Sequence, residues 1–286
     1  MHFVSRNSLQ DSSFNSTHKS LLIRNLGPFD GAAVVVSNVI GSGIFIVPAF
    51  VAQGVPNAWG MLSVWFVGGL LAFAGAMAYA ELATLRPRAG GEYVYLREAF
   101  GPVAGFLTGW TSFVAGFSGA IAASAVGLAS YLGRFVPAAA DTTPFFQIPL
   151  AVVTLTLSPQ SIVALTAIGG LSVVHIFGLG PGRILQNLLA ALKVLVLMVF
   201  VAVGFSIGQG STSNFVASGG GVVVSSWALA LIPVMFSYSG WNAASYLAEE
   251  MRDPGRNVPL ALGIGTGAVV LIYLLLNFRK KWFLLW

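Results

Sequence analysis

The stretch NVIGSGIF, residues 38–45, lies inside an apolar run that extends from about residue 30 to residue 53. A run of this length crosses the hydrocarbon core of a bilayer as a helix, which takes about 20 residues. Gly41 and Gly43 interrupt the run, because glycine is a poor helix residue whose backbone unwinds readily. Unwound backbone at membrane depth must be buried in protein or line a cavity, since lipid cannot satisfy its N–H and C=O groups. The stretch therefore predicts a broken membrane helix that forms a site.

The remainder of the chain agrees with a membrane location. Of its 286 residues, 56% are hydrophobic and 8% are charged, whereas an average soluble chain has about a quarter charged residues. Seven runs are long and apolar enough to span a bilayer. They are residues 30–53, 60–82, 101–132, 160–178, 185–207, 227–248 and 259–277. An eighth run, Phe145 to Leu157, is too short to cross alone, and we expect it to be re-entrant or interfacial and packed against the fourth span.

Basic residues alternate between the predicted loops. If the N-terminus is cytoplasmic, the outer loops before residue 278 contain only Arg134. The inner loops contain Arg6, Lys19, Arg24, Arg86, Arg88, Arg97, Arg183, Arg252 and Arg256. This asymmetry satisfies the positive-inside rule and explains the net charge of +5 without a nucleic acid partner. We expect a polytopic protein of a plasma membrane or bacterial inner membrane, with residues 1–28 as a cytoplasmic tail.

A second interruption, FSYSGWN at residues 236–242, follows Pro233 in the sixth run. It predicts free carbonyls at the end of a half-helix, where the negative end of the dipole stabilises an ammonium group. In the first break, the N–H groups near Ser42 to Phe45 would instead hold a carboxylate. Glycine and serine could also serve close helix packing. Because the breaks begin two five-helix units of opposite topology, they favour an inverted-repeat transporter site for a zwitterion.

Further motifs occur in order along residues 30–277. They are the stretch 38–45, YAEL at 79–82, RPRAGGEY at 86–93, EAFG at 98–101, QN at 186–187 ahead of Lys193, FSYSGW at 236–241, EE at 249–250 and PGRNVP at 254–259. In these motifs the chain resembles the amino acid-polyamine-organocation permeases, especially the L-type amino-acid transporters and serine/threonine exchangers. The resemblance implies an all-α, five-plus-five inverted-repeat fold of the LeuT type. Helices 1–5 would lie in residues 29–208, and helices 6 and 7 of the second repeat in residues 227–277.

The resemblance also implies a secondary amino-acid transporter that works by alternating access and needs no cofactor. The substrate carboxylate would bind the backbone of Ser42, Gly43 and Ile44. The ammonium group would meet carbonyls near Phe236, Ser237 and Ser239, with the Phe236 ring as a gate over the substrate. The predicted binding set is Ile40, Gly41, Ser42, Gly43, Ile44, Phe236, Ser237, Tyr238, Ser239 and Gly240. The family often has glycine where Ser239 stands, which leaves the size of the preferred side chain open.

Lys193 lies about eight residues, roughly 12 Å, into the fifth span. A charge at this depth is costly unless it has a partner or snorkels toward the interface. In the resembled family, a lysine here is similar in place to a bound sodium ion of sodium-coupled relatives. The resemblance thus implies a coupling role for Lys193 and sodium-independent transport, with exchange and proton coupling both open.

Other residues argue against an enzyme. The chain has no cysteine, its three histidines are too scattered for a metal site, and no span contains a catalytic constellation. Glu81, Glu92 and Glu98 are predicted to pair with nearby arginines.

The last residues, 279–286, read RKKWFLLW and would place three basic residues on the outer side. They predict an aberrant tail over residues 278–286. The alternative to a working carrier is therefore a truncated, non-transporting fragment of such a permease. Which amino acid binds, and whether an accessory subunit or an oligomer is involved, stays open.

Overall fold

The computed structural model describes residues 24–150, 154–176, 179–207, 221 and 223–282, and these residues are mostly helical. The α-helices are α2 (Pro28–Val39), α3 (Gly43–Gly54), α4 (Ala58–Leu85), α5 (Glu92–Phe100), α6 (Pro102–Thr111), α7 (Phe117–Leu132), α8 (Pro159–Ile176), α9 (Leu179–Ile207), α11 (Val224–Ser237) and α12 (Pro254–Trp282). A π-helical turn, η2 (Ser112–Gly116), joins α6 to α7. Two short 3-10 helices, η3 (Pro137–Ala140) and η4 (Ala243–Leu247), complete the helical part.

Six of the seven predicted spans are confirmed as helices of membrane-crossing length. Five are single stretches, namely Ala58–Leu85, Pro102–Leu132, Pro159–Ile176, Gly182–Val203 and Pro254–Phe278. The sixth is the pair α2 and α3, which qualifies together although it is bent by 50°. The predicted span 227–248 contains the interruption that the sequence indicates, and it is not among the helices of membrane-crossing length. It consists of α11, turns and η4, because the chain leaves the helix at the interruption that the sequence contains.

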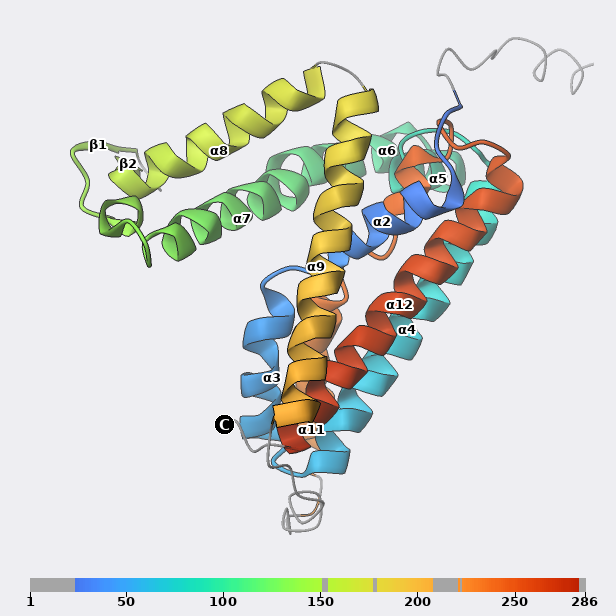
Figure 1. Ribbon diagram of the computed structural model, residues 1–286. Helices are drawn as coiled ribbons and strands as arrows, with labels where there is room; N and C mark the ends of the chain where they lie inside the picture. The colour runs from blue at the N-terminus through green and yellow to red at the C-terminus, as the bar shows by residue number, and fades with distance from the viewer. Residues whose placement is uncertain (1–23, 151–153, 177–178, 208–220, 222, 283–286) are drawn as a thin grey trace, which may run out of the picture.

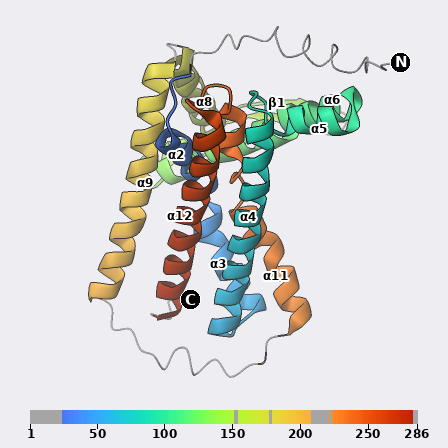
Figure 2. The ribbon, with the colours of Figure 1, turned by 90° about the vertical axis from the view of Figure 1, so that its right-hand side faces the viewer.

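The long helices form a bundle from which two others project. α4, α9 and α12 run side by side, and α3 and α11 lie beside one half of their length (Figures 1 and 2). α7 and α8 pack antiparallel to each other and extend across the direction of the bundle (Figure 1). Most of the apolar side chains of α7 and α8 are exposed, which suits contact with lipid and not with water.

Glycines allow the helices of the bundle to approach closely. A Cβ atom built on Gly31 of α2 would lie 2.7 Å from the Cβ of Ala261 in α12. One built on Gly68 of α4 would lie 2.6 Å from a methyl carbon of Val234 in α11. Small residues at such crossings are typical of membrane helices, whose association depends on close van der Waals packing.

The described parts of the eighth apolar run form two short strands and not a membrane-crossing helix. β1 (Phe146–Pro149) pairs antiparallel with β2 (Thr154–Leu157), so that Phe146 lies opposite Leu157. β2 lies next to the start of α8, as expected for a piece beside the fourth span. This exposed pair of strands is an exception to the predicted all-helical fold.

The loops predicted to share the cytoplasmic side meet at one end of the bundle. The N–H of Arg252 donates to the carbonyl of Leu26 (2.9 Å), and Arg183 donates to the carbonyl of Asn25 (3.3 Å). The N–H of Ala89 donates to a carboxylate oxygen of Glu249 (3.1 Å). This common end is the one from which α2 and α12 begin (Figure 1).

The predicted terminal segments lie largely outside the described residues. Of the predicted tail 1–28, the structure describes only residues 24–28, and α2 begins at Pro28. At the other end, α12 continues through the predicted boundary at residue 278 and ends at Trp282. Residues 283–286 lie outside the described part.

Candidate functional site: two broken helices

The first break lies where the sequence predicts it. α2 ends at Val39, residue Ile40 closes its last turn with an N–H to Val36 bond, and α3 begins at Gly43. Among the described residues, the N–H groups of positions 41–44 have no hydrogen-bond acceptor. Gly41 and Ser42 are exposed. This helix N-terminus therefore offers several unpaired donors and a partial positive charge, which is the environment that a carboxylate prefers.

The second break also coincides with its predicted position. α11 ends at Ser237, and the chain turns through Gly240 before η4. Gly240 has a φ of +102°, and a Cβ atom there would lie 3.0 Å from the Cβ of Asn38 in α2. Glycine is required at this position because the backbone is left-handed and because α2 lies so close.

The two breaks contact each other. A Cβ atom built on Gly43 would lie 2.9 Å from the Oγ of Ser237 and 3.2 Å from its Cα. The end of α11 and the start of α3 are thus in direct contact, as the ends of α11 and α2 are at Gly240. The structure brings together the two sequence segments that contain all ten predicted binding residues, although they are almost two hundred positions apart.

The predicted binding residues differ in their exposure. Ile40, Ile44, Ser237 and Tyr238 are buried, whereas Gly41, Ser42 and Ser239 are exposed and Gly43 and Gly240 are intermediate. The side chain of Phe236 is 75% exposed. Its ring, predicted to be a gate, is not packed over the breaks in this structure.

Two of the carbonyls predicted to meet an ammonium group, those of Phe236 and Ser237, already accept a hydrogen bond. The carbonyl of Phe236 accepts the N–H of Ser239 (3.1 Å), and that of Ser237 lies 3.2 Å from the hydroxyl of Tyr273 in α12. Because a carbonyl oxygen has two lone pairs, each can accept a second donor. The sequence did not indicate this contact of Tyr273, because it showed only that the residue lies in an apolar run.

Lys193 has partners at the first break. Its Nζ donates to the carbonyls of Ser37 (3.0 Å) and Ile40 (3.2 Å), and the side chain is partly buried. These carbonyls belong to the last turn of α2, where intrahelical donors are missing and the dipole is negative. The lysine therefore caps the broken helix and does not extend toward the membrane surface.

The prediction that three glutamates pair with arginines is correct only for Glu98. Its carboxylate lies 2.5 Å from Arg86 and 3.5 Å from Arg88. Glu81 has no arginine within ion-pair distance in the described part of the chain. Among the described residues, Glu92 accepts hydrogen bonds from neutral donors and has no arginine within ion-pair distance.

Glu92 connects α4 and α5 to the segment after the second break. It accepts a hydrogen bond from the hydroxyl of Tyr79 (3.2 Å), and others from the Asn242 amide and the Tyr246 hydroxyl. Gly91 allows this arrangement, since a Cβ atom there would lie 2.9 Å from the ring of Tyr246. Asn242 and Tyr246 are four residues apart, a spacing that could have indicated that they share one face.

Replacing Glu92 with leucine is expected to lower the free energy of unfolding by at least about 2 kcal/mol, because three donors lose a charged acceptor. Thermal unfolding in detergent measures the change. Glu98→Leu is the control on the same helix, and loss of its exposed ion pair is expected to cost less than about 1 kcal/mol. Equal destabilisation by the two variants would contradict a special role for the Glu92 cluster.

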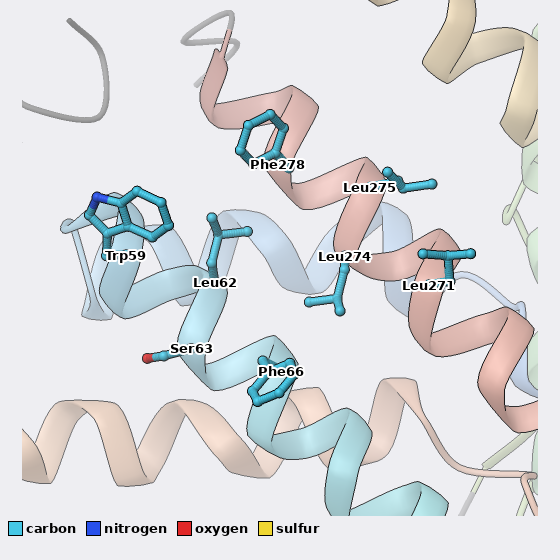
Figure 3. A pocket seen from close by; sticks show the side chains of 8 residues that line it. All are labelled: Trp59, Leu62, Ser63, Phe66, Leu271, Leu274, Leu275 and Phe278. Carbon is cyan, nitrogen blue, oxygen red and sulfur yellow. The ribbon is translucent and has the colours of Figure 1, made fainter. Parts of the chain in front are cut away.

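A groove between α4 and α12 has the wrong chemistry for a zwitterion. It has a volume of about 420 Å³ and is lined by Trp59, Leu62, Ser63, Phe66, Leu271, Leu274, Leu275 and Phe278 (Figure 3). Ser63 supplies its only hydroxyl, which donates to the Gly60 carbonyl and accepts from the indole N–H of Trp227. The groove suits an apolar occupant, so the broken helices remain the better candidate for a polar substrate.

The fold and the breaks define the class of protein. Several helices of membrane-crossing length, with two interruptions in contact, describe an integral membrane protein with a broken-helix site. Residues 26–279 match the family model described as amino acid permease. The chain belongs to the amino acid permease family.

Named transporters are among the similar proteins. The chain is 34% identical over 261 residues to the b(0,+)-type amino acid transporter 1 of Oryctolagus cuniculus, covering 90% of this chain and 50% of the relative. It is 30% identical over 270 residues to the Asc-type amino acid transporter 1 of Mus musculus, covering 92% and 48%. It is 29% identical over 262 residues to the cystine/glutamate transporter of Pongo abelii, covering 91% and 50%. The chain spans about half the length of these relatives.

Proposed function

We propose that this chain forms the amino-acid-binding part of a secondary carrier, with the substrate held between the two breaks. The unpaired N–H groups at positions 41–44, next to the C-terminal end of α11, are the observation that supports it most directly. The family membership and the amino-acid transporters among its relatives support the same substrate class.

The polarity of the two breaks matches an α-amino acid. The start of α3 presents donors and partial positive charge to the carboxylate, and the end of α11 presents carbonyls to the ammonium group. Since backbone supplies both contacts, the site recognises the part that all amino acids share. The side chain of the substrate is left to neighbouring groups such as Ser239 and Phe236.

Lys193 supports transport without sodium. Backbone carbonyls at a broken helix are the usual ligands of a coupling sodium ion, and here the Lys193 ammonium group binds two of them. A covalently attached ammonium group in this place would perform the structural part of the role of sodium. The breaks themselves would supply the hinges for alternating access, because short unwound segments absorb large changes in φ and ψ.

Binding of a radiolabelled amino acid to the purified chain in lipid nanodiscs tests the proposed site. Competition by an L-amino acid, its D-enantiomer, its methyl ester and its N-acetyl derivative separates the contacts. We expect the ester and the acetylated form to compete at least tenfold more weakly than the free acid, because each lacks one charged group. Equal competition by all four would overturn the site.

Uptake into liposomes that contain the chain tests the carrier activity. Saturable, stereoselective uptake that persists when choline replaces sodium is the expected result. Binding without uptake would overturn the carrier proposal and favour the non-transporting alternative. Uptake that requires sodium would overturn the proposed role of Lys193.

A further inference from the structure

Two polar side chains join α2 to α9 at the end of the bundle where α2 begins. The side-chain amide of Asn187 in α9 donates to the Oδ1 of Asp30 in α2 at 2.7 Å. The other carboxylate oxygen of Asp30 accepts the backbone N–H of Gly27, the residue before α2, at 2.8 Å. One carboxylate therefore both caps the first turn of α2 and attaches that turn to α9.

The amide of Asn187 depends on this contact. Its oxygen is buried and has no hydrogen-bond partner in the described part of the chain. Burying an amide is costly unless it is hydrogen-bonded, so the bond to Asp30 compensates for the burial of this side chain. The QN motif at residues 186–187, to which the proposed function gives no role, thus contains the residue that holds α2.

Apolar packing between α2 and α9 is incomplete. A groove of about 490 Å³ is lined by residues of α2, α9 and α12, many of them small. They include Ala32 and Ala33 of α2 and Ala190 and Ala191 of α9. Side chains that border a groove lack partner atoms on one side and gain little dispersion energy. The attachment of α2 to α9 therefore depends on the polar contacts at the two ends of α2.

The polar contacts at the two ends of α2 differ in stiffness. At the end next to the first break, Lys193 reaches the carbonyls of Ser37 and Ile40 through a flexible stem of four carbons. Asp30 and Asn187 have short side chains, so their bond keeps the two backbones at a nearly fixed distance. Without this bond, α2 could move away from α9 as far as the lysine stem allows. The short contact therefore sets the position of α2.

We propose that Asp30 and Asn187 are a positioning pair that holds α2 against α9, so that Lys193 stays within reach of the first break. Neither residue belongs to the proposed binding set. The structural part of this inference stands on the hydrogen bonds and the groove, and its effect on substrate affinity rests on the proposed function.

The absence of cysteine from the chain allows spin labels to be attached at chosen pairs of positions. Phe29→Cys with Leu192→Cys reports the distance between α2 and α9. Phe29→Cys with Leu260→Cys reports the distance between α2 and α12. All three side chains are exposed. Pulsed electron paramagnetic resonance on the purified chain in lipid nanodiscs then gives both distance distributions.

Asn187→Leu removes the amide and leaves Asp30 to cap α2. We expect the population with a longer α2–α9 distance to rise about tenfold, the effect of losing a hydrogen bond to a charged group. The α2–α12 distances should stay those of the parent, because Gly31 still packs on Ala261. An unchanged α2–α9 distribution would overturn the positioning role. Equal broadening of both distributions would show general loosening and overturn it as well.

Gln186→Leu is the matched control, since it removes an amide from the neighbouring position of α9. Among the described residues, Asp30 accepts hydrogen bonds from Gly27 and Asn187 and not from Gln186. The α2–α9 distances are therefore expected to match those of the parent. If this control separated the helices as much as Asn187→Leu, a specific role for Asn187 would be contradicted.

Exchanging the two residues tests the pairing itself. Asn187→Asp alone sets two carboxylates against each other and should give the largest separated population. In Asp30→Asn/Asn187→Asp, the amide and the carboxylate change places, and the amide oxygen can still accept the N–H of Gly27. We expect the separated population to return to within about twofold of the parent. A double variant no closer to the parent than Asn187→Asp would overturn the direct pairing.

Amino-acid binding separates this inference from the proposed function. Asn187→Leu is expected to bind the free amino acid about tenfold more weakly, with the discrimination against its methyl ester preserved. Because the effect passes through Lys193, the same change in the Lys193→Met background should weaken binding by less than about twofold. A further tenfold loss there would overturn the link to Lys193. If the parent chain binds no amino acid but the α2–α9 distances respond as expected, the positioning role stands and the proposed function falls.

Discussion

Replacing Gly43 with tryptophan is expected to abolish amino-acid binding, with a loss of affinity of at least about 100-fold. Even a Cβ atom at this position would come within 3.2 Å of the Cα of Ser237. Backbone cannot rotate away as a flexible side chain can, so the start of α3 and the end of α11 must separate. Equilibrium binding in nanodiscs measures the loss, and circular dichroism shows whether the helices persist.

Gly54→Trp is the control for Gly43→Trp, since it adds the same bulk to the same helix. Among the described residues, apart from its chain neighbours and the nearby backbone of its own helix, nothing lies within 4 Å of a Cβ built on Gly54, and the residue is exposed. We expect binding close to that of the parent. Gly43→Ala should be intermediate, because it adds only the first atom of the clash. If Gly43→Trp bound amino acids normally, the substrate would have to lie elsewhere.

Replacing Lys193 with methionine, which has a similar length and no charge, is expected to weaken binding by about 30-fold or more. The carbonyls of Ser37 and Ile40 lose their donor, and each unpaired buried carbonyl costs about 1–3 kcal/mol. The end of α2 then has no compensating cation, so the loop that precedes α3 is no longer fixed. The same binding assay, repeated at several sodium concentrations, measures the effect.

Arg183→Met is the control for the loss of a cation from α9. Its guanidinium makes one bond of 3.3 Å to the Asn25 carbonyl and lies 4.0 Å from Asp30, with 40% of the side chain exposed. A change of less than about fivefold is expected, since exposed ion pairs contribute at most about 1 kcal/mol. Normal binding by Lys193→Met would show that capping of α2 is dispensable.

The sequence was sufficient to place both breaks. Gly41 and Gly43 interrupt one apolar run, and Gly240 with its serine neighbours interrupts another, so local backbone preferences alone gave the positions. The same preferences did not predict that the chain after the second break forms only turns and the short helix η4. Hydropathy over residues 227–248 is the same for a continuous helix as for α11 followed by turns and η4.

Contacts between distant segments were the main part that sequence could not supply. Glu92 lies close to arginines in the chain, yet it turns toward Asn242 and Tyr246, because α5 starts beside η4. Tyr273 lies in the apolar run 269–276 of α12, where nothing local shows which face meets the breaks. The direction of α7 and α8 is likewise a property of packing, since their composition indicates only that they suit lipid.

The contact between Gly43 and Ser237 also constrains how the two halves of the chain can diverge. A larger residue at position 43 would meet the Cα of residue 237 whatever side chain stands there. We therefore expect position 43 to stay glycine among homologues and position 237 to stay small, even though no local pattern links them. A chimera joined between the two positions, with its halves taken from different relatives, would fold about this centre only when both parents carry compatible sizes there. Recombination between family members would therefore yield folded proteins only when the residues at positions 43 and 237 fit each other.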